Sequence, residues 1–363
     1  MRKHLAAITL KKLRNSVVRF SLSTHDKKSF SMKKPSSANR KANESEEFNN
    51  WEKLSQKTKD FLETIDISKV DLNKLNINDA RKKFFETQNA IETDLSGVIV
   101  YTKHINADGF TLSLEIVKPK SQTGTLPAFI FICGGGWVFG NFESHKRMIR
   151  DLVVESQCAG ISINYTPSPE SKYPQALTEI YAACVWIAQH AEELDIFADR
   201  IGLVGNSAGG NMAAAIAMMA SVENKIQFRL LVLICPITSG VSRELSAVLP
   251  TIIHRFASSL RNWVADQYAR CEEDKNEIYF SPLSASLDQL AGLPRTFIQI
   301  AENDPLRAEA EAFGRKLDKA GVLVTTVTYN GVIHDFGLFN ALAELPQTRS
   351  LFAHSGAELK KHL

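Results

Sequence analysis

The chain has 363 residues, of which 44% are hydrophobic and 23% are charged, a composition typical of proteins that bury a core. Residues 1–40 carry eleven Lys or Arg and one acid, so they hold a net charge of +10 and leave −7 for the rest of a chain whose total is +3. A mildly acidic body argues against a nucleic-acid surface, and the lack of an apolar run of about 18 residues argues against an integral membrane segment. The length suits one large α/β domain with an accessory segment, or two domains.

The first 50 residues are predicted to form a disordered, basic N-terminal extension. Residues 1–40 are basic, contain serines and have a single acid, which also resembles a mitochondrial transit peptide. Three alternatives stay open: a targeting segment, a basic tail, and an upstream extension that precedes a true start at Met32.

The cysteine pattern favours a reducing compartment. The count is odd, the spacings are long, and most of the cysteines lie in apolar stretches, so no disulfide framework is predicted. We therefore expect a cytoplasmic protein, or a mitochondrial one if the N-terminus is a transit peptide. The cysteines are Cys133, Cys158, Cys184, Cys235 and Cys271.

After the extension, residues 51–94 are predicted to form helices, and residues 95–363 an α/β domain. Apolar spacing predicts helices over 51–65 and 79–90, and the domain then alternates strands with helices, which indicates a mostly parallel sheet covered on both faces. The alternation of strands and helices is interrupted around 240–280, where an amphipathic helical segment (252–271) indicates an insertion. Eight strands are predicted, over residues 98–102, 110–117, 127–133, 160–165, 200–204, 230–235, 296–301 and 323–329, and the other helices over 146–156, 173–194, 211–220, 309–320 and 346–359.

The most informative motif is Gly205-Asn206-Ser207-Ala208-Gly209, which follows an apolar strand and precedes a helix. A strand, a tight turn with serine at its apex and a helix form the nucleophile-elbow pattern. The turn leaves little room for a Cβ two residues before and after the serine, which explains Gly205 and Gly209. The motif therefore makes Ser207 a candidate nucleophile toward an acyl carbon.

Two further candidates follow the last two strands. His334 comes after the final strand and Asp304 after the one before it, so both are expected at the carboxyl edge of the sheet. The order Ser207, Asp304, His334 is the order used by hydrolases with a nucleophile elbow. His334 would accept the serine proton, and Asp304 would orient the ring and stabilise the imidazolium. Glu302 is the weaker alternative acid, while Asp304 could also be a simple helix N-cap.

An oxyanion site is predicted from backbone amides. Ala208 N–H begins the helix after the elbow, and the glycines 134–136 end a buried strand, where a flexible turn is the alternative interpretation. Glycines let backbone amides approach a substrate closely, so this segment would complete the site.

These motifs together resemble the hormone-sensitive-lipase-like branch of the α/β-hydrolases over roughly residues 95–345. The family's His-Gly-Gly-Gly loop is similar to residues 133–136, its Tyr-Arg-Leu-Ala-Pro-Glu segment to 165–170, and its acid loop to 304–309. The resemblance implies the α/β-hydrolase fold, oxyanion donation by Gly135 and Gly136, and a helical cap formed by the N-terminal helices and the insertion. We expect Trp137 and Phe139, with the cap, to line the acyl or alcohol pocket.

The loop departs from the family at Cys133, which stands where the family has histidine. The histidine ring normally buttresses the loop, so its loss could loosen the loop or alter the pH profile. Catalytic donors are backbone amides, so activity need not be abolished. A redox or nucleophilic role for Cys133 is a further alternative.

The sequence thus predicts a serine carboxylesterase that acts on short- to medium-chain acyl esters through an acyl-enzyme. A non-catalytic small-molecule receptor on the same fold, and an amide or carbamate hydrolase with the same residues, remain alternatives. No H-E-x-x-H, paired C-x-x-C, P-loop or G-x-G-x-x-G motif occurs, so neither a metal nor a cofactor is expected. The expected partner is a small-molecule acyl ester, with a homodimer left open.

Overall fold

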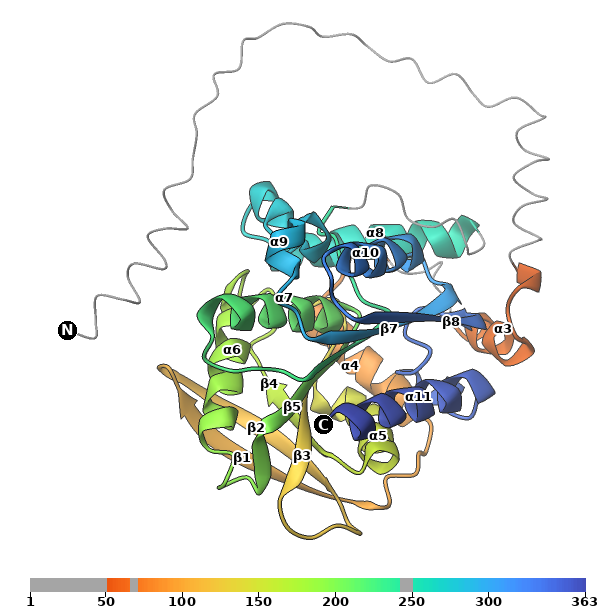
Figure 1. The fold of residues 1–363 in the computed structure, drawn as a ribbon. Helices are drawn as coiled ribbons and strands as arrows, with labels where there is room; N and C mark the ends of the chain where they lie inside the picture. Colours follow the sequence, from red (N-terminus) through yellow and green to blue (C-terminus); the bar gives the residue numbers. More distant parts are fainter. Residues whose placement is uncertain (1–50, 66–70, 242–250) are drawn as a thin grey trace, which may run out of the picture. The chain divides into compact units, whose positions relative to one another are not determined.

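An eight-stranded sheet organises the protein, and its strand order is β1-β2-β4-β3-β5-β6-β7-β8 (Figure 1). The structure, a computed structural model, describes residues 51–65, 71–241 and 251–363, so the predicted extension over 1–50 lies outside the described residues. The strands are β1 (Val98–Ala107), β2 (Phe110–Pro119), β3 (Leu126–Ile132), β4 (Ala159–Asn164), β5 (Ile196–Asn206), β6 (Leu230–Ile234), β7 (Arg295–Asn303) and β8 (Val324–Ile333). Strands β3 to β8 pair in parallel and β2 pairs antiparallel with β1 and β4, which confirms the mostly parallel α/β-hydrolase sheet predicted from the sequence.

Both faces of the sheet are buried, because its central strands are apolar at nearly every position. In β3, Ile130 and Ile132 join one apolar cluster, whereas Phe129 and Phe131 join the other. Alternate side chains of a strand point to opposite faces, so a continuous apolar run fits a sheet with helices on both sides.

Helices cover both faces of the sheet (Figure 1). Helices α6 (Gln175–Gln189), α7 (Ala208–Glu223) and α10 (Arg307–Lys319) contribute to the first apolar cluster. Helices α5 (Phe142–Ser156) and α11 (Pro346–His362) contribute to the second. The sheet is therefore held rigidly between two layers, and the loops at its carboxyl edge are left to carry the site.

Several predicted boundaries were wrong, among them those of β5 (200–204), β8 (323–329), and the helices 146–156 and 211–220, and two further cases have clear local reasons. Strand β1 extends to Ala107, because the hairpin turn uses only Asp108 and Gly109, both with positive φ (47° and 89°), and Ala107 pairs with Phe110. Such a two-residue turn fits the twist of the strands it joins. The helix expected over 173–194 spans only Gln175–Gln189, because the chain turns at His190 before it enters β5.

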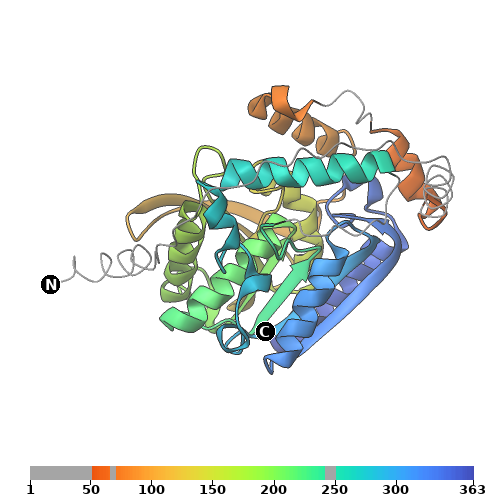
Figure 2. The ribbon, with the colours of Figure 1, turned by 90° about the horizontal axis from the view of Figure 1, so that it is seen from above.

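Helical segments outside the two layers are α3 (Gln56–Glu63), α4 (Ile77–Asn89), α8 (Thr251–Tyr268) and α9 (Leu287–Leu290). Figure 2 shows α8, the long teal helix, lying across the body of the fold. The helices expected in 51–94 and in the 240–280 insertion are therefore present, while their division into a cap stays a prediction. Within the described ranges, none of the helices has the length and apolarity needed to span a bilayer.

Candidate active site

Ser207 occupies the turn between β5 and α7, with φ 51° and ψ −119°. Only a constrained backbone holds a non-glycine residue in such a conformation. Its N–H donates to Ile234 O at 2.9 Å, and its own carbonyl accepts from Asn211 N at 3.0 Å. A Cβ on Gly205 would overlap the backbone of Gly209, so the turn requires glycine there.

The structure brings the three predicted residues together in one hydrogen-bonded chain. Ser207 Oγ lies 2.9 Å from His334 Nε2, and His334 Nδ1 lies 2.8 Å from Asp304 Oδ2. The serine follows β5, the histidine follows β8 and the aspartate follows β7, so three parallel strands deliver them to one edge of the sheet. This is the geometry that a nucleophile, a base and an orienting acid require.

The two carboxylate oxygens of Asp304 have separate partners, and the helix N-cap alternative is wrong, because Leu306 is the N-cap residue of α10. One carboxylate oxygen, Oδ1, accepts from Leu306 N at 2.8 Å near the start of α10, while Oδ2 faces the His334 ring. Asp304 is 1% exposed, so its oxygens depend on partners within the protein for hydrogen bonds. Glu302 is directed elsewhere, because its Oε2 accepts from Gly331 N at 2.9 Å.

Asp335 supplies a second carboxylate on the other side of the ring. Its Oδ2 lies 3.6 Å from His334 Nε2, and its Oδ1 accepts from Asn206 Nδ2 at 3.1 Å. Its φ of 54° turns the side chain back under the neighbouring histidine. Sequence reasoning missed this arrangement, since a residue adjacent to the histidine approaches the ring only with this left-handed backbone.

The charges around His334 decide its protonation. Burial by itself disfavours the imidazolium, but the carboxylates of Asp304 and Asp335 outweigh burial and raise the His334 pKa to about 9. A histidine acts as a general base only when it is neutral, so the reactive form should increase as the pH rises toward that pKa.

Three backbone N–H groups near Ser207 have no hydrogen-bond acceptor among the described residues: those of Gly135, Gly136 and Ala208. Gly135 and Gly136 have φ of 94° and 61°. A Cβ on Gly136 would come within 2.7 Å of Val264 in α8, so the absence of a side chain lets this helix approach the loop. Unpaired amides of this kind are what an oxyanion site needs.

The loop that begins at Cys133 is held without the family's histidine. Asn206 Oδ1 accepts from Gly134 N at 3.0 Å, and Tyr165 OH donates to Cys133 O at 3.0 Å. The Cys133 thiol is buried beside Ser162 Oγ (3.5 Å), and burial raises its pKa to about 12. A thiol kept protonated is a poor nucleophile, so the geometry argues against a reactive role for Cys133.

Asn206 links the loop to the base, which sequence reasoning also missed. Its amide accepts from Gly134 N and donates to Asp335, so one side chain joins the elbow, the glycine loop and the segment after β8. A carboxylate at this position could not donate to Asp335. The only signal in the sequence was a polar residue soon after the apolar run 201–204.

The two expected pocket residues differ in exposure. Trp137 is 1% exposed, and its ring stacks on Tyr268 at 4.8 Å and packs on Phe280. Phe139 is partly exposed and stacks on Trp263 of α8 at 6.0 Å. Trp137 is thus enclosed by aromatic side chains, and its role in a substrate pocket stays a prediction, as does that of Phe139.

A cavity of about 490 Å³ borders the start of the glycine loop at Cys133. Its lining includes Phe84 of α4, Glu115 of β2, Cys133 and Phe139, but not Ser207 or His334. The cavity is therefore distinct from the space in front of the nucleophile, and we assign it no part in the reaction.

One group of possible metal ligands occurs in the described residues: Cys235, Asp304 and His334, whose ligand atoms lie within 4.8 Å of one another. Asp304 and His334 are already hydrogen-bonded to each other, and His334 to Ser207. These contacts satisfy both ring nitrogens, so the group is accounted for by the hydrogen-bonded chain.

Comparisons with known proteins show that the chain is similar to esterases and has the α/β-hydrolase fold. A model of the α/β-hydrolase-fold family matches residues 129–338. An arylesterase of Saccharolobus solfataricus is 31% identical over 74% of this chain and 86% of its own, and an ethyl acetate hydrolase of Pseudomonas putida is 29% identical over 76% and 87%. The crystal structure of a thermostable esterase from Pseudomonas putida ECU1011 superposes with a TM-score of 0.80 at 41% identity, over 85% of this chain and 98% of that one.

The charges around His334 predict the pH dependence of activity. We expect kcat/KM to rise with pH and reach half its maximum near pH 9, where His334 loses its proton. Replacing Asp335 with Asn removes a negative charge 3.6 Å from Nε2, so the acid limb should move to lower pH and activity at pH 7 should increase. The measurement is a pH series of kcat/KM for p-nitrophenyl acetate.

The matched control is Asp288→Asn, which neutralises an exposed acid on α9 and should leave the profile unchanged. An acid limb that stays at the same pH in Asp335→Asn would contradict this account of the His334 pKa.

Proposed function

Because this chain belongs to the hormone-sensitive-lipase-like esterases of the α/β-hydrolase fold, we propose that it is a serine-dependent carboxylic ester hydrolase. The observation that carries the proposal is the unbroken chain from Ser207 Oγ through His334 to Asp304, beside three unpaired N–H groups. The proposed catalytic residues are therefore Ser207, His334 and Asp304.

Acylation begins when Ser207 Oγ attacks the carbonyl carbon of the ester and its proton passes to His334 Nε2. The tetrahedral oxyanion accepts hydrogen bonds from Gly135, Gly136 and Ala208. The bond from the carbonyl carbon to the alcohol oxygen then breaks, and His334 returns its proton to the departing alkoxide. The acyl group is left as an ester on Ser207.

Deacylation follows the same steps, with water as the nucleophile in place of Ser207. His334 takes a proton from water as the water oxygen attacks the acyl carbon, and the same amides hold the second oxyanion. The bond to Ser207 Oγ breaks, His334 protonates that oxygen, and the carboxylic acid leaves. Asp304 stabilises the imidazolium in both halves without taking the proton itself.

The two alternatives, a non-catalytic receptor and an amide or carbamate hydrolase, have less support. A receptor that only binds a small molecule does not need a histidine bonded to the serine, yet His334 contacts Ser207 at 2.9 Å. An amide or carbamate hydrolase would use the same residues, but the similar proteins of defined substrate are an arylesterase and an ethyl acetate hydrolase. Ester hydrolysis is therefore the proposed reaction.

The substrate class proposed is a short- to medium-chain acyl ester. The ethyl acetate hydrolase of Pseudomonas putida supports a short acyl group. On the site itself, Phe139 and Trp263 form a stacked aromatic pair between the glycine loop and α8, a wall suited to an apolar chain of limited length. Trp137 would act behind this wall, through packing on Tyr268.

We also propose that the protein lies in a reducing compartment, the cytoplasm. A homodimer is proposed as well. The free thiols of the described residues support the first, since four of the five are buried. The alternative of a mitochondrial protein depends on residues 1–40, which lie outside the described residues.

Replacing Ser207 with Ala should lower kcat for p-nitrophenyl acetate by at least about 10⁴-fold, because members of such a chain act as a unit. Ser221→Ala is the matched control, since Ser221 lies near the exposed end of the same helix and should have wild-type activity. Retention of more than about a tenth of the activity by Ser207→Ala would exclude the proposed mechanism.

A series of p-nitrophenyl esters from acetate to palmitate tests the substrate class. We expect kcat/KM to be highest between the acetyl and octanoyl esters and to fall for longer chains, because the proposed wall of Phe139 and Trp263 would limit the length of the acyl chain. Highest activity on the palmitoyl ester would contradict the proposed chain-length limit while leaving the serine mechanism intact.

A further inference from the structure

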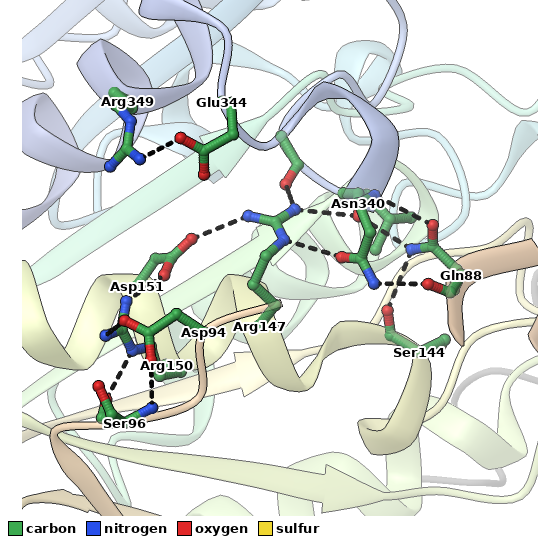
Figure 3. A network of polar contacts seen from close by, with 12 residues as sticks. Gln88, Asp94, Ser96, Ser144, Arg147, Arg150, Asp151, Asn340, Glu344 and Arg349 are labelled. Carbon is green, nitrogen blue, oxygen red and sulfur yellow. Dashed lines mark hydrogen bonds and ion pairs between the residues drawn. The ribbon is translucent and has the colours of Figure 1, made fainter. Parts of the chain in front are cut away.

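Gln88 is buried on a helix that is otherwise largely polar and accessible. Gln88 is 3% exposed, and it is the one buried residue of α4. Figure 3 shows it in contact with two other parts of the chain. A buried amide is costly unless its donors and acceptor are all bonded, so the contacts of Gln88 need an explanation.

Both N–H donors of the amide, and its oxygen, are hydrogen-bonded. Nε2 donates to Leu338 O at 2.9 Å and to Ser144 O at 3.3 Å, and Oε1 accepts from Asn340 N at 3.3 Å. The main-chain carbonyl of Gln88 also accepts from Asn340 Nδ2 at 2.7 Å. A single residue thus ties α4 to the segment 338–340 and to α5.

Those two partners lie in segments that follow the two loops of the proposed active site. Leu338 and Asn340 follow His334 within six residues, with no regular strand or α-helix between them. Ser144 lies in the first turn of α5, whose N-cap residue Asn141 follows Gly136 by five residues. The position of α4 is therefore linked to the histidine and to the oxyanion amides together.

Arg147 completes the attachment from the opposite side (Figure 3). Its side chain is 5% exposed, and its guanidinium donates to Asn340 Oδ1 at 2.8 Å, to Leu338 O at 3.1 Å and to Gly337 O. Asp151 balances its charge at 2.8 Å. The segment 337–340 is held between a buried arginine and a buried glutamine, which fixes its backbone to one conformation.

A similar attachment precedes the histidine. Thr58 of α3 is fully buried and donates through Oγ1 to Gly331 O at 2.9 Å, while Ser55 N donates to the same carbonyl at 2.8 Å. Gly331 lies three residues before His334. The segment that carries His334 is thus anchored on both sides by the N-terminal helices.

We propose that Gln88 is a positioning residue that sets the distance between His334 and Ser207, and that α4 thereby controls the rate of catalysis. The proposal rests on the proposed function, since it concerns the same serine and histidine. Gln88 does not contact either of them and acts through Leu338 and Asn340. Removal of its bonds releases the 337–340 segment on one side and lets the imidazole move away from Ser207 Oγ.

The test variant is Gln88→Met, which has a similar length but can neither donate nor accept these hydrogen bonds. Thr87→Ala is the matched control, because the neighbouring Thr87 is exposed and its Oγ1 bonds only to Lys83 O within the helix. The measurements are kcat and KM for p-nitrophenyl acetate, and the rate constant for labelling of Ser207 by a fluorophosphonate, below the unfolding temperature of each variant.

Gln88→Met should lower kcat about 10- to 100-fold, with KM within twofold of wild type and labelling slowed to the same extent. Thr87→Ala should match wild type in all three values. A role limited to holding the fold would lower the unfolding temperature but leave kcat unchanged, and a role in the substrate pocket would raise KM alone. Either result would overturn the proposal.

Asn340→Ala removes the partner from the other side and decides the question if Gln88→Met does not fold. It should lower kcat and labelling with little change in KM, and unchanged values would overturn the proposal. Where both single variants fold, their double variant should lose little more activity than either alone, because both act through the same segment. Failure of the proposed function would instead appear as activity in Ser207→Ala, whatever value Gln88→Met gives.

Discussion

The hydrogen bond between Ser207 Oγ and His334 Nε2, at 2.9 Å, is the contact on which the rest of the active site depends. Its two partners are 127 residues apart in sequence, and neither strand that delivers them pairs with the other in the sheet. A parallel sheet buried on both faces fixes their relative positions, because β6 and β7 lie between β5 and β8 in register. The rigid sheet thus makes a precise contact between distant loops possible.

Around this contact the backbone is packed more closely than side chains would permit. Gly209 lies against Ile132 and Cys133, so the elbow and the glycine loop share a surface with no room for a Cβ. Asn206 then joins the same loop to Asp335 through its amide. The nucleophile, the oxyanion amides and the base are therefore parts of one bonded unit, and a shift in any one of them is transmitted to the others.

The sequence predicted the features that follow from local chemistry and strand order. The alternation of apolar strands with helices predicted a mostly parallel sheet, and the resemblance to the hormone-sensitive-lipase-like family implied the α/β-hydrolase fold. Both are confirmed. The strand pattern also placed His334 and Asp304 after adjacent strands, where the structure has them. Apart from the resemblance, each of these inferences needed only the periodicity of a segment and its position relative to a strand end.

What could not be predicted depends on three-dimensional contacts between distant residues. Gln88 is an ordinary glutamine in a polar helix, and only the folded chain shows that it bonds to Leu338 and Ser144. The contact between Asp335 and His334 depends on the φ of 54° at Asp335, which the sequence pattern does not indicate. The burial of Trp137 followed from its stacking on Tyr268, 131 positions later in the sequence, which no local pattern reveals.

The most direct test of the central claim is to find the atom that forms the covalent bond. Wild-type protein labelled with a fluorophosphonate and digested with trypsin should carry the adduct on Ser207, within the peptide 201–225. His334→Ala should remain unlabelled under the same conditions, because no base would activate the serine. An adduct on another residue, or full labelling of Ser207 without His334, would contradict the account.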